Sequence, residues 1–203
     1  MTPCGTDGEG RFGYGRGVLG VVLAAGLGER MGGRKARLLV GGVPLAALHA
    51  RRMIEAGAAR VVVVTRPDDV GVAPEAIAAT STEPDPAGSL ARALDALAPS
   101  PDDVVLVTPV DALPARADVL ALLARAVTDR TLAATPTYEG RGGHPVAARA
   151  SALLDARGRP LRDVLTALGD RRARVAVDDP SVLVDLDTPE AVRRALGVEP
   201  TFG

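Results

Sequence analysis

The chain has 203 residues, of which 47% are hydrophobic, and this content can bury one large core in a single domain. Its formal net charge of −1 provides no positive field that would attract nucleic acid or an anionic membrane surface. Two Tyr, two Phe and no Trp leave few rings for stacking on single-stranded nucleic acid, so the composition argues against nucleic-acid binding.

Residues 1–17 contain six glycines and no periodic apolar pattern, which predicts a disordered, dispensable arm ahead of the first strand. The single cysteine, Cys4, has no partner for an internal disulfide. The sequence shows neither a charged-then-apolar leader nor an apolar run long enough to span a membrane. These features predict a cytoplasmic protein without membrane contact.

The segment Val18 to Ala25 is almost unbroken Val, Leu and Ala, which is typical of a strand covered on both faces in a parallel sheet. It leads into a turn with glycines at positions 26, 28, 32 and 33. Such glycines let the backbone turn sharply and point its N–H groups at phosphate oxygens. Arg30 and Lys35 add two positive charges. The segment therefore predicts a binding site for a nucleoside triphosphate.

Two other phosphate-binding motifs fit this segment less well. A P-loop needs Gly-Lys-Ser/Thr after four intervening residues, but at that spacing from Gly28 the chain has Gly33 and Arg34. The dinucleotide fingerprint needs a small residue where the chain has Met31, and the next predicted strand leads to Arg66 rather than to an acid. An NADP-dependent oxidoreductase that uses Arg66 stays open, as does a plain tight turn with solvated charges.

Helices and strands alternate along the rest of the chain. Apolar spacing predicts helices at Pro44 to Gly57, Ser89 to Leu97, Val119 to Val127 and Pro160 to Leu168, and strands at Val61 to Thr65, Val104 to Thr108, Leu132 to Pro136, Val175 to Val177 and Val182 to Leu186. The stretch from Arg66 to Pro86 has no assignment. This order predicts a single-domain, three-layer, Rossmann-like α/β sandwich at residues 18–198, with a largely parallel mixed sheet and a tail at 199–203.

Two acidic residues follow predicted strands of this sheet, Asp111 beyond the strand that ends at Thr108 and Asp187 at the end of the last one. Carboxylates at one sheet edge can hold Mg²⁺ together with phosphate oxygens. Asp185 alternates with Asp187 along the strand and is expected on the same face. An ordinary helix-capping role for Asp187 is the alternative, and whether Asp178 or Asp185 assists is left open.

His144 lies in Gly142-Gly143-His144-Pro145, where glycines on one side and proline on the other fix its position. A histidine in a loop is more often a hydrogen-bonding or surface residue than a catalyst. It is not predicted to bind metal, because no second His or Cys has ligand spacing. His49 lies within a predicted helix, and no function is predicted for it.

The turn after the first strand resembles the signature of MobA-like NTP-transferase domains, Leu-Ala-Ala-Gly, x, Gly, x, Arg-Met-Gly, x, x, Lys. The chain has every fixed position of it: Leu23, Ala24, Ala25, Gly26, Gly28, Arg30, Met31, Gly32 and Lys35. Later segments are also similar to the family: Leu38-Leu39, Gly42, Pro44-Leu45, Ser89-Leu90, Asp111, Gly143-His144-Pro145 and Asp185 to Glu190. The resemblance runs from Leu19 to about Leu196. It is strongest to the molybdenum cofactor cytidylyltransferase branch.

This resemblance implies a fold like that of nucleotide-diphospho-sugar transferases and transfer of an NMP group from an NTP, CTP or GTP, with release of pyrophosphate. The implied acceptor is a small phosphorylated molecule of molybdopterin type, and a downstream molybdoenzyme or chaperone is an implied partner of a monomer or homodimer. The resemblance implies the following site residues: catalytic Arg30, Lys35 and Asp111; nucleotide-binding Leu23, Ala24, Ala25, Gly26, Gly28, Arg30, Lys35 and Ser89; Mg²⁺-binding Asp111 and Asp187; acceptor-binding His144.

Two departures from the family pattern leave the identity of the acceptor open. Family members usually have proline two residues after the central aspartate, whereas here Pro114 follows Asp111 by three positions. Ala91 and Ala93 stand where the family usually has Arg and Gly. A sugar- or polyol-phosphate nucleotidyltransferase therefore remains an alternative, and a non-catalytic nucleotide-binding protein is an alternative of another class.

Overall fold

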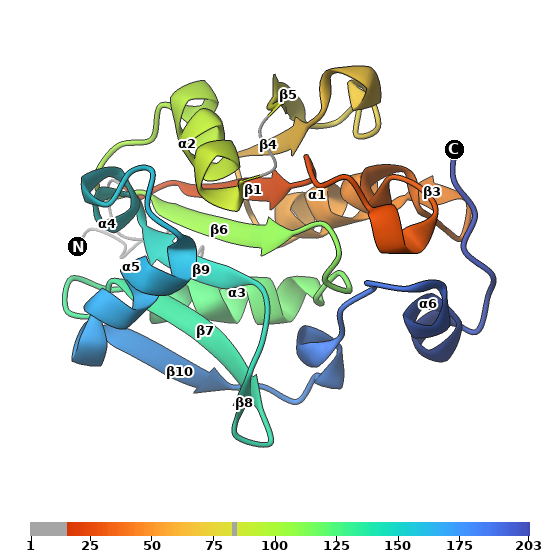
Figure 1. Cartoon of the computed structure of the whole chain (residues 1–203). Coiled ribbons are helices and arrows are strands. Elements are labelled where there is room, and N and C mark those ends of the chain that lie inside the picture. The colour runs from red at the N-terminus through yellow and green to blue at the C-terminus, as the bar shows by residue number, and fades with distance from the viewer. Residues whose placement is uncertain (1–15, 83–84) are drawn as a thin grey trace, which may run out of the picture.

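A central sheet organises the fold (Figure 1). The computed structural model describes residues 16–82 and 85–203, and in these residues the sheet has eight strands in the order β10-β7-β9-β6-β1-β4-β5, with β8 paired to β7. Its strands are β1 (Val18–Leu23), β4 (Arg60–Thr65), β5 (Ile77–Thr80), β6 (Val104–Pro109), β7 (Ala133–Tyr138), β8 (Arg141–Gly142), β9 (Val146–Arg149) and β10 (Arg172–Ala176). A separate hairpin of β2 (Leu39–Val40) and β3 (Val43–Pro44) precedes the first helix.

Pairing in the central sheet is mostly parallel. β1 lies between β4 and β6 and is parallel to both, β5 is parallel to β4, and β10 is parallel to β7. β9 lies antiparallel between β6 and β7. The predicted single-domain α/β sandwich with a largely parallel mixed sheet is confirmed. The carboxyl ends of β1, β4 and β6 lie at one edge, where α/β proteins bind their ligands.

Helices cover both faces of the sheet. They are α1 (Leu45–Glu55), α2 (Pro86–Leu97), α3 (Ala117–Ala126), α4 (Ala150–Asp155), α5 (Leu161–Ala167) and α6 (Pro189–Leu196). Apolar residues of α1, α3 and α6 share one core cluster, and those of α2, α4 and α5 share the other. None of the helices in residues 16–82 and 85–203 has both the length and the apolar character needed to cross a bilayer.

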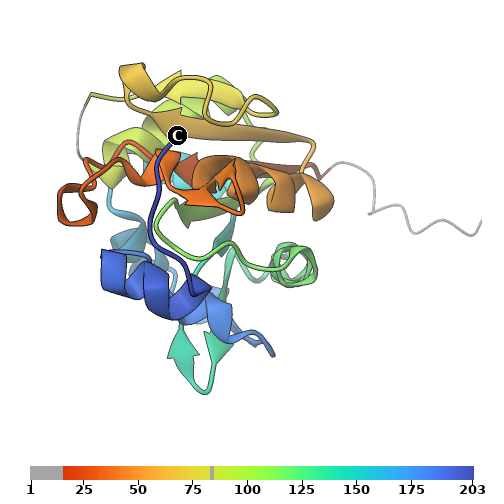
Figure 2. The ribbon, with the colours of Figure 1, turned by 90° about the vertical axis from the view of Figure 1, so that its right-hand side faces the viewer.

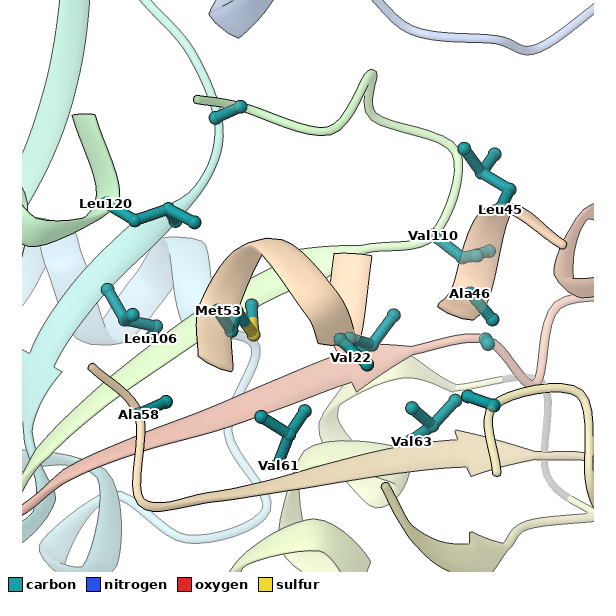
Figure 3. Packing of buried hydrophobic residues seen from close by; sticks show 14 of the residues in the cluster. Val22, Leu45, Ala46, Met53, Ala58, Val61, Val63, Leu106, Val110 and Leu120 are labelled. Carbon is teal, nitrogen blue, oxygen red and sulfur yellow. The ribbon is translucent and has the colours of Figure 1, made fainter. Parts of the chain in front are cut away.

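Successive residues of β1 supply the two core clusters, as the alternation of a strand buried on both faces requires. Val21 belongs to the cluster of α2, and Val22 belongs to the cluster that contains Met53 of α1 and Leu106 of β6 (Figure 3). A Cβ atom on Gly20 would lie 2.6 Å from the sulfur of Met53. Glycine at this position therefore allows α1 to pack closely on β1.

Local sequence sets the start of two helices. Asp85 caps α2 by accepting hydrogen bonds from the N–H groups of Ala87 and Gly88, with Pro86 in the first helical turn. Thr188 caps α6 in the same way, and Pro189 follows it. Thr188 rather than Asp187 is the N-cap residue, so the alternative of a helix-capping role for Asp187 is wrong.

The predicted strand Val182 to Leu186 is wrong. A 3₁₀ helix, η5 (Pro180–Leu183), takes up its first half, and in the second half Asp185 forms an isolated bridge with Ala112. The cause is local, because Pro180 lacks an N–H group and the Asp179 carboxylate accepts a hydrogen bond from the Ser181 N–H. The chain therefore turns before it can extend.

The last two residues of the predicted N-terminal arm, Arg16 and Gly17, are part of the described structure. Residues 1–15 of the predicted arm lie outside the described residues. Gly17, by contrast, donates its N–H to the Asp103 carboxylate at 2.9 Å, and Arg16 forms an ion pair with Asp129. These two residues contact the domain directly.

The predicted tail at 199–203 lies against the start of the domain. The Leu39 N–H donates to the Thr201 carbonyl at 2.7 Å, and Phe202 forms a bridge with Leu38. Figure 2 shows this last segment, in dark blue, passing beside the β2–β3 region. A Cβ atom on Gly33 would lie 2.8 Å from three atoms of the Phe202 ring, so the tail packs directly on the glycine-rich turn.

Candidate functional site

The glycine-rich turn after β1 folds back on itself at the carboxyl edge of the sheet. Gly28 has φ of 67°, and a Cβ atom there would lie 2.3 Å from the Gly33 carbonyl oxygen. Only glycine meets both conditions without strain. A short 3₁₀ helix, η1 (Glu29–Met31), follows, and its Met31 side chain is buried in the core. The turn is thus anchored by Met31, while its charged side chains stay near the surface.

This turn lines a cavity of about 510 Å³, which we call the loop cavity. The cavity brings together most of the residues predicted for nucleotide binding: Leu23, Ala25, Gly26, Gly28, Arg30, Lys35 and Ser89. Asp111, which is predicted to be catalytic and to bind the metal, also lines it. Ala24 is not among the lining residues, because it continues β1 by donating its N–H to the Val64 carbonyl and is buried. Ser89 comes from the first turn of α2.

Lys35 joins the two predicted metal-binding carboxylates. Its Nζ lies 2.8 Å from Oδ2 of Asp111 and 2.5 Å from Oδ1 of Asp187. Arg30 Nη2 lies 3.4 Å from the other carboxylate oxygen of Asp187. Lys35 sits at the start of the 3₁₀ helix η2 (Lys35–Arg37), and its side chain is only 13% exposed. Residues distant in the sequence thus converge on one ammonium group.

The charges of this cluster stabilise one another. Burial alone would lower the pKa of Lys35, but hydrogen bonds from its ammonium to Asp111 and Asp187 raise it above 10.5. The hydrogen bond from Lys35 likewise holds the pKa of Asp187 below its ordinary value. Lys35 and Asp187 are therefore both ionised at neutral pH.

Two carboxylates that reach one cation form an oxygen-donor set that a divalent ion can use. Mg²⁺ is commonly held by one or two carboxylates, with substrate phosphates and water completing its octahedron. Asp111 and Asp187 fit that pattern, since the same Nζ contacts both. Within residues 16–82 and 85–203 there is no group of three or more His, Cys, Asp or Glu that could hold a metal ion by itself. A metal here would need the phosphates of a bound nucleotide.

A second cavity, of about 430 Å³, lies beside the β7–β8 hairpin, and we call it the hairpin cavity. His144 and Asp185 line it, together with residues of α5, η5 and β10. The His144 N–H donates to the Val182 carbonyl at 2.8 Å. Its Nδ1 atom is buried and has no hydrogen-bond partner in the described part of the chain. The fold therefore leaves this buried ring nitrogen unsatisfied.

Asp185 and Asp187 lie in different places, contrary to the expectation that they share one face. Asp187 is paired with Lys35, whereas Asp185 lines the hairpin cavity. The backbone turns at η5 instead of extending, so strand alternation does not apply. Burial raises the pKa of Asp185, and the charges of Asp111, Asp187 and Lys35 act on it as well. Asp185 also forms a bridge with Ala112, and the Leu186 N–H donates to the Asp111 carbonyl, so the hairpin cavity lies beside the charge cluster of the loop cavity.

Sequence reasoning missed Asp69, which holds the segment around Lys35 in place. This carboxylate is 1% exposed and accepts hydrogen bonds from Arg34 at 2.8 Å and from Arg37 at 2.6 Å. Burial alone would raise the pKa of Asp69, but these two guanidinium groups hold it below its ordinary value. The sequence has a pair of acidic residues, Asp68-Asp69, just after a buried strand, which could have indicated this function. No secondary structure was predicted for the stretch around the pair.

Asp69→Asn is expected to lower the free energy of unfolding by about 3 kcal/mol, because it leaves two arginines without their buried partner. Asp68→Asn is the matched control. Asp68 contacts Arg34 as well, but its side chain is 79% exposed, so the loss should stay below about 1 kcal/mol. Urea denaturation of both variants measures the difference, and equal losses would show that Asp69 is not the anchor.

His49 has a structural function that the sequence did not indicate. It is buried in α1, and its Nε2 lies 2.9 Å from the Ala112 carbonyl and 3.3 Å from the Val110 carbonyl. Because carbonyls only accept, Nε2 carries the proton. His49 thus braces the two peptide groups on either side of Asp111.

Burial lowers the pKa of His49 to about 4 from an ordinary 6.5. The unfolded chain therefore binds a proton at this residue at a higher pH than the folded chain. The contribution of neutral His49 to the free energy of unfolding is therefore fully present above pH 6.5. It is lost as the pH falls toward 4. When the pH is lowered from 7 to 5, the free energy of unfolding of the parent should fall by about 2 kcal/mol more than that of His49→Gln. Urea denaturation at both pH values measures this difference. Parallel losses in the two proteins would contradict a neutral, buried His49.

Comparisons with known proteins identify the family and the fold. Residues 20–183 match the MobA-like NTP transferase domain. No curated protein sequence matches the chain. Among solved structures, a nucleotidyl transferase from Methanothermobacter thermautotroptrophicus superposes with a TM-score of 0.76 at 21% identity, covering 90% of this chain and 97% of that one.

Three further solved structures, which come from two proteins, share the fold. Rv0371c from Mycobacterium tuberculosis has a TM-score of 0.76 at 20% identity, with 90% of this chain and 98% of that chain covered. The same protein has also been solved in complex with manganese, at a TM-score of 0.70 and 20% identity over 89% of this chain and 98% of that one. The bifunctional IspDF from Campylobacter jejuni has a TM-score of 0.71 at 17% identity, over 88% of this chain and 54% of that one.

Proposed function

Because the chain belongs to the MobA-like NTP transferase domain family, we propose that it transfers an NMP group from a nucleoside triphosphate to a phosphorylated acceptor and releases pyrophosphate. The observation that carries this proposal is the position of Lys35 in the loop cavity, where it touches both Asp111 and Asp187. A structural turn has no need of a mostly buried cation between two carboxylates. A site for phosphates and a metal ion needs all three groups.

In this proposal the triphosphate lies in the loop cavity, with its phosphates over the glycine-rich turn. Arg30 and Lys35 bind phosphate oxygens, and backbone N–H groups of the turn add hydrogen bonds. Ser89 also lines the loop cavity, and in this proposal it lies near the base. Magnesium held by Asp111 and Asp187 would neutralise charge on the phosphate oxygens. Since the Lys35 ammonium lies between these carboxylates, it would move toward the phosphates when metal and nucleotide enter.

The reaction itself is an in-line displacement. An oxygen of the acceptor phosphate forms a bond to the α-phosphorus, and the bond from that phosphorus to the bridging oxygen of the β-phosphate breaks. The electron pair leaves with pyrophosphate, so no covalent enzyme intermediate is needed. The residues of the loop cavity position the triphosphate and stabilise the charge that develops on its oxygens.

We propose that the acceptor binds in the hairpin cavity, because Asp185 lines this cavity and forms a bridge with Ala112, the residue next to Asp111. The unpaired Nδ1 of His144 can bind a polar group of the acceptor. On the resemblance noted above, we propose CTP or GTP as the nucleotide and a molybdopterin-type acceptor. A sugar or polyol phosphate is the second candidate for the acceptor.

Thermal unfolding with CTP, GTP, ATP and NADPH, each with and without MgCl₂, tests the proposed class of ligand. At ~100 times its Kd a ligand stabilises the folded state by ~2.7 kcal/mol, which is a measurable rise in Tm. We expect a rise with CTP or GTP that is larger with magnesium, and none with NADPH. A rise with NADPH alone would favour the oxidoreductase alternative.

A further inference from the structure

The Phe202 ring lies directly against the glycine-rich turn that carries Lys35. The three heavy atoms nearest to a Cβ atom on Gly33 would be Cε1, Cε2 and Cζ of Phe202, each at 2.8 Å. A point equally distant from these three atoms lies over the centre of the ring, so Gly33 faces the flat side of the ring. A distance of 2.8 Å is well inside van der Waals contact, so a side chain at Gly33 would displace the ring.

This contact accounts for the glycine at position 33. Gly28 and Gly32 have left-handed φ of 67° and 71°, a conformation that favours glycine whatever surrounds it. Gly33 has no φ in that range, and it stands at one of the free positions of the signature given above. Neither a left-handed backbone nor the signature therefore accounts for glycine here, whereas the Phe202 ring does.

Backbone pairing of the tail at 199–203 holds the chain on the other side of Lys35. The Gly203 N–H donates to the Arg37 carbonyl at 3.1 Å, and Nη1 of Arg37 donates to the Gly203 carbonyl at 3.0 Å. The contact at Gly33 and the contact at Arg37 each lie two residues from Lys35. The same short segment thus holds the chain on both sides of the lysine.

We infer that Phe202 is a positioning residue for the glycine-rich turn, and that its ring keeps Lys35 in place for the phosphates of a bound nucleotide. The ring supports Gly33, whose carbonyl oxygen packs closely against Gly28 across the turn. Without the ring the turn opens locally, and the Lys35 ammonium loses its fixed position between the two carboxylates. The inference rests on the proposed function, since it takes Lys35 to bind the triphosphate.

Amine-directed labelling with N-hydroxysuccinimidyl acetate tests this inference without nucleotide or turnover, because Lys35 is the only lysine of the chain. The Lys35 side chain is 13% exposed, and its hydrogen bonds to carboxylates keep the ammonium protonated. Phe202→Ala should raise the labelling rate of Lys35 by about tenfold, since loss of a partly buried ring favours the open turn. Mass spectrometry separates Lys35 from the terminal amino group.

Two matched variants should label at the parent rate. Phe202→Tyr keeps the flat ring, and Val198→Ala removes an exposed apolar side chain just before the tail. Labelling is carried out well below the Tm of each variant, so that global unfolding does not contribute to the rate. The same labelling rate in the parent and in Phe202→Ala, or faster labelling in Phe202→Tyr, would overturn the inference.

Gly33→Ala approaches the same contact from the turn. Its methyl group should displace the ring, so the labelling rate of Lys35 should again rise. In the double variant the methyl group takes the space that the ring leaves, so labelling should be no faster than in Phe202→Ala alone. A double variant in which the two effects multiply, to about a hundredfold, would show that Gly33 and Phe202 act separately.

Turnover of the same samples separates this inference from the proposed function. With CTP or GTP, MgCl₂ and a phosphorylated acceptor, Phe202→Ala should lower kcat by about tenfold, because a displaced Lys35 stabilises less of the charge that develops on the phosphates. The KM for the acceptor should change by less than about twofold, since the residues that line the hairpin cavity come from outside the tail.

The possible failures are distinguishable. Faster labelling of Phe202→Ala in a protein that transfers no NMP group would contradict the proposed function and leave the support of the turn by Phe202 in place. Parent-like labelling and kcat in Phe202→Ala would reject the inference and leave the proposed function standing.

Discussion

Lys35→Ala should lower the rate of nucleotidyl transfer by roughly 10² or more, because it removes a preorganised charge at the phosphates. The variant also leaves Asp111 and Asp187 facing each other without their shared cation. Stopped-flow measurement of pyrophosphate release would show the loss in turnover. Arg60→Ala is a suitable control, since Arg60 is an exposed cation at the opposite end of β4 and should change the rate little.

The sequence allows a second, independent measurement at this position. Lys35 is the only lysine among the 203 residues, although the chain has 24 Lys and Arg in total. Amine-directed labelling therefore reports on one side chain besides the terminal amino group. CTP or GTP with magnesium should protect Lys35 from labelling, as mapped by mass spectrometry. Wild-type turnover in a folded Lys35→Ala protein would remove this lysine from the reaction.

Asp111→Asn and Asp187→Asn should each abolish most of the metal-dependent activity while the protein stays folded. Asparagine keeps the size of the side chain but removes the charge that a divalent ion requires. The two residues should not compensate for each other, since both contact the same Lys35 Nζ. The expected loss in rate is on the order of 10² or more for each variant.

Manganese binding followed by electron paramagnetic resonance checks this expectation without turnover. The parent should bind Mn²⁺ tightly when CTP or GTP is present, and both Asn variants should bind it more weakly. Asp95→Asn is the control, because Asp95 is an exposed residue of α2 that forms an ion pair with Arg157. Parent-like metal binding and turnover in both Asn variants would place the metal elsewhere.

Much of the fold could be predicted because its signals are local. The apolar run of β1, the glycines after it and the proline-led helix starts each occur within a few residues, and the structure has them where the pattern puts them. The strand predicted at Val182 to Leu186 failed for a local reason too. Pro180 and the Asp179 cap outweigh the alternating pattern that follows them.

The residues that support the site could not be predicted in this way. Asp69 holds Arg34 and Arg37 across more than thirty residues of sequence, and His49 braces the carbonyls beside Asp111 from another element. Such pairings depend on which elements become neighbours, and the pattern of one segment does not contain that information.

Analysis of the products tests the central claim most directly. The parent is incubated with CTP or GTP, MgCl₂ and a panel of phosphorylated acceptors, and pyrophosphate and acceptor masses are measured together. The proposed function predicts one pyrophosphate released for each acceptor that gains an NMP group, with neither product formed when EDTA is present. Nucleotide binding without release of pyrophosphate from any acceptor would contradict it and favour a non-catalytic nucleotide-binding protein.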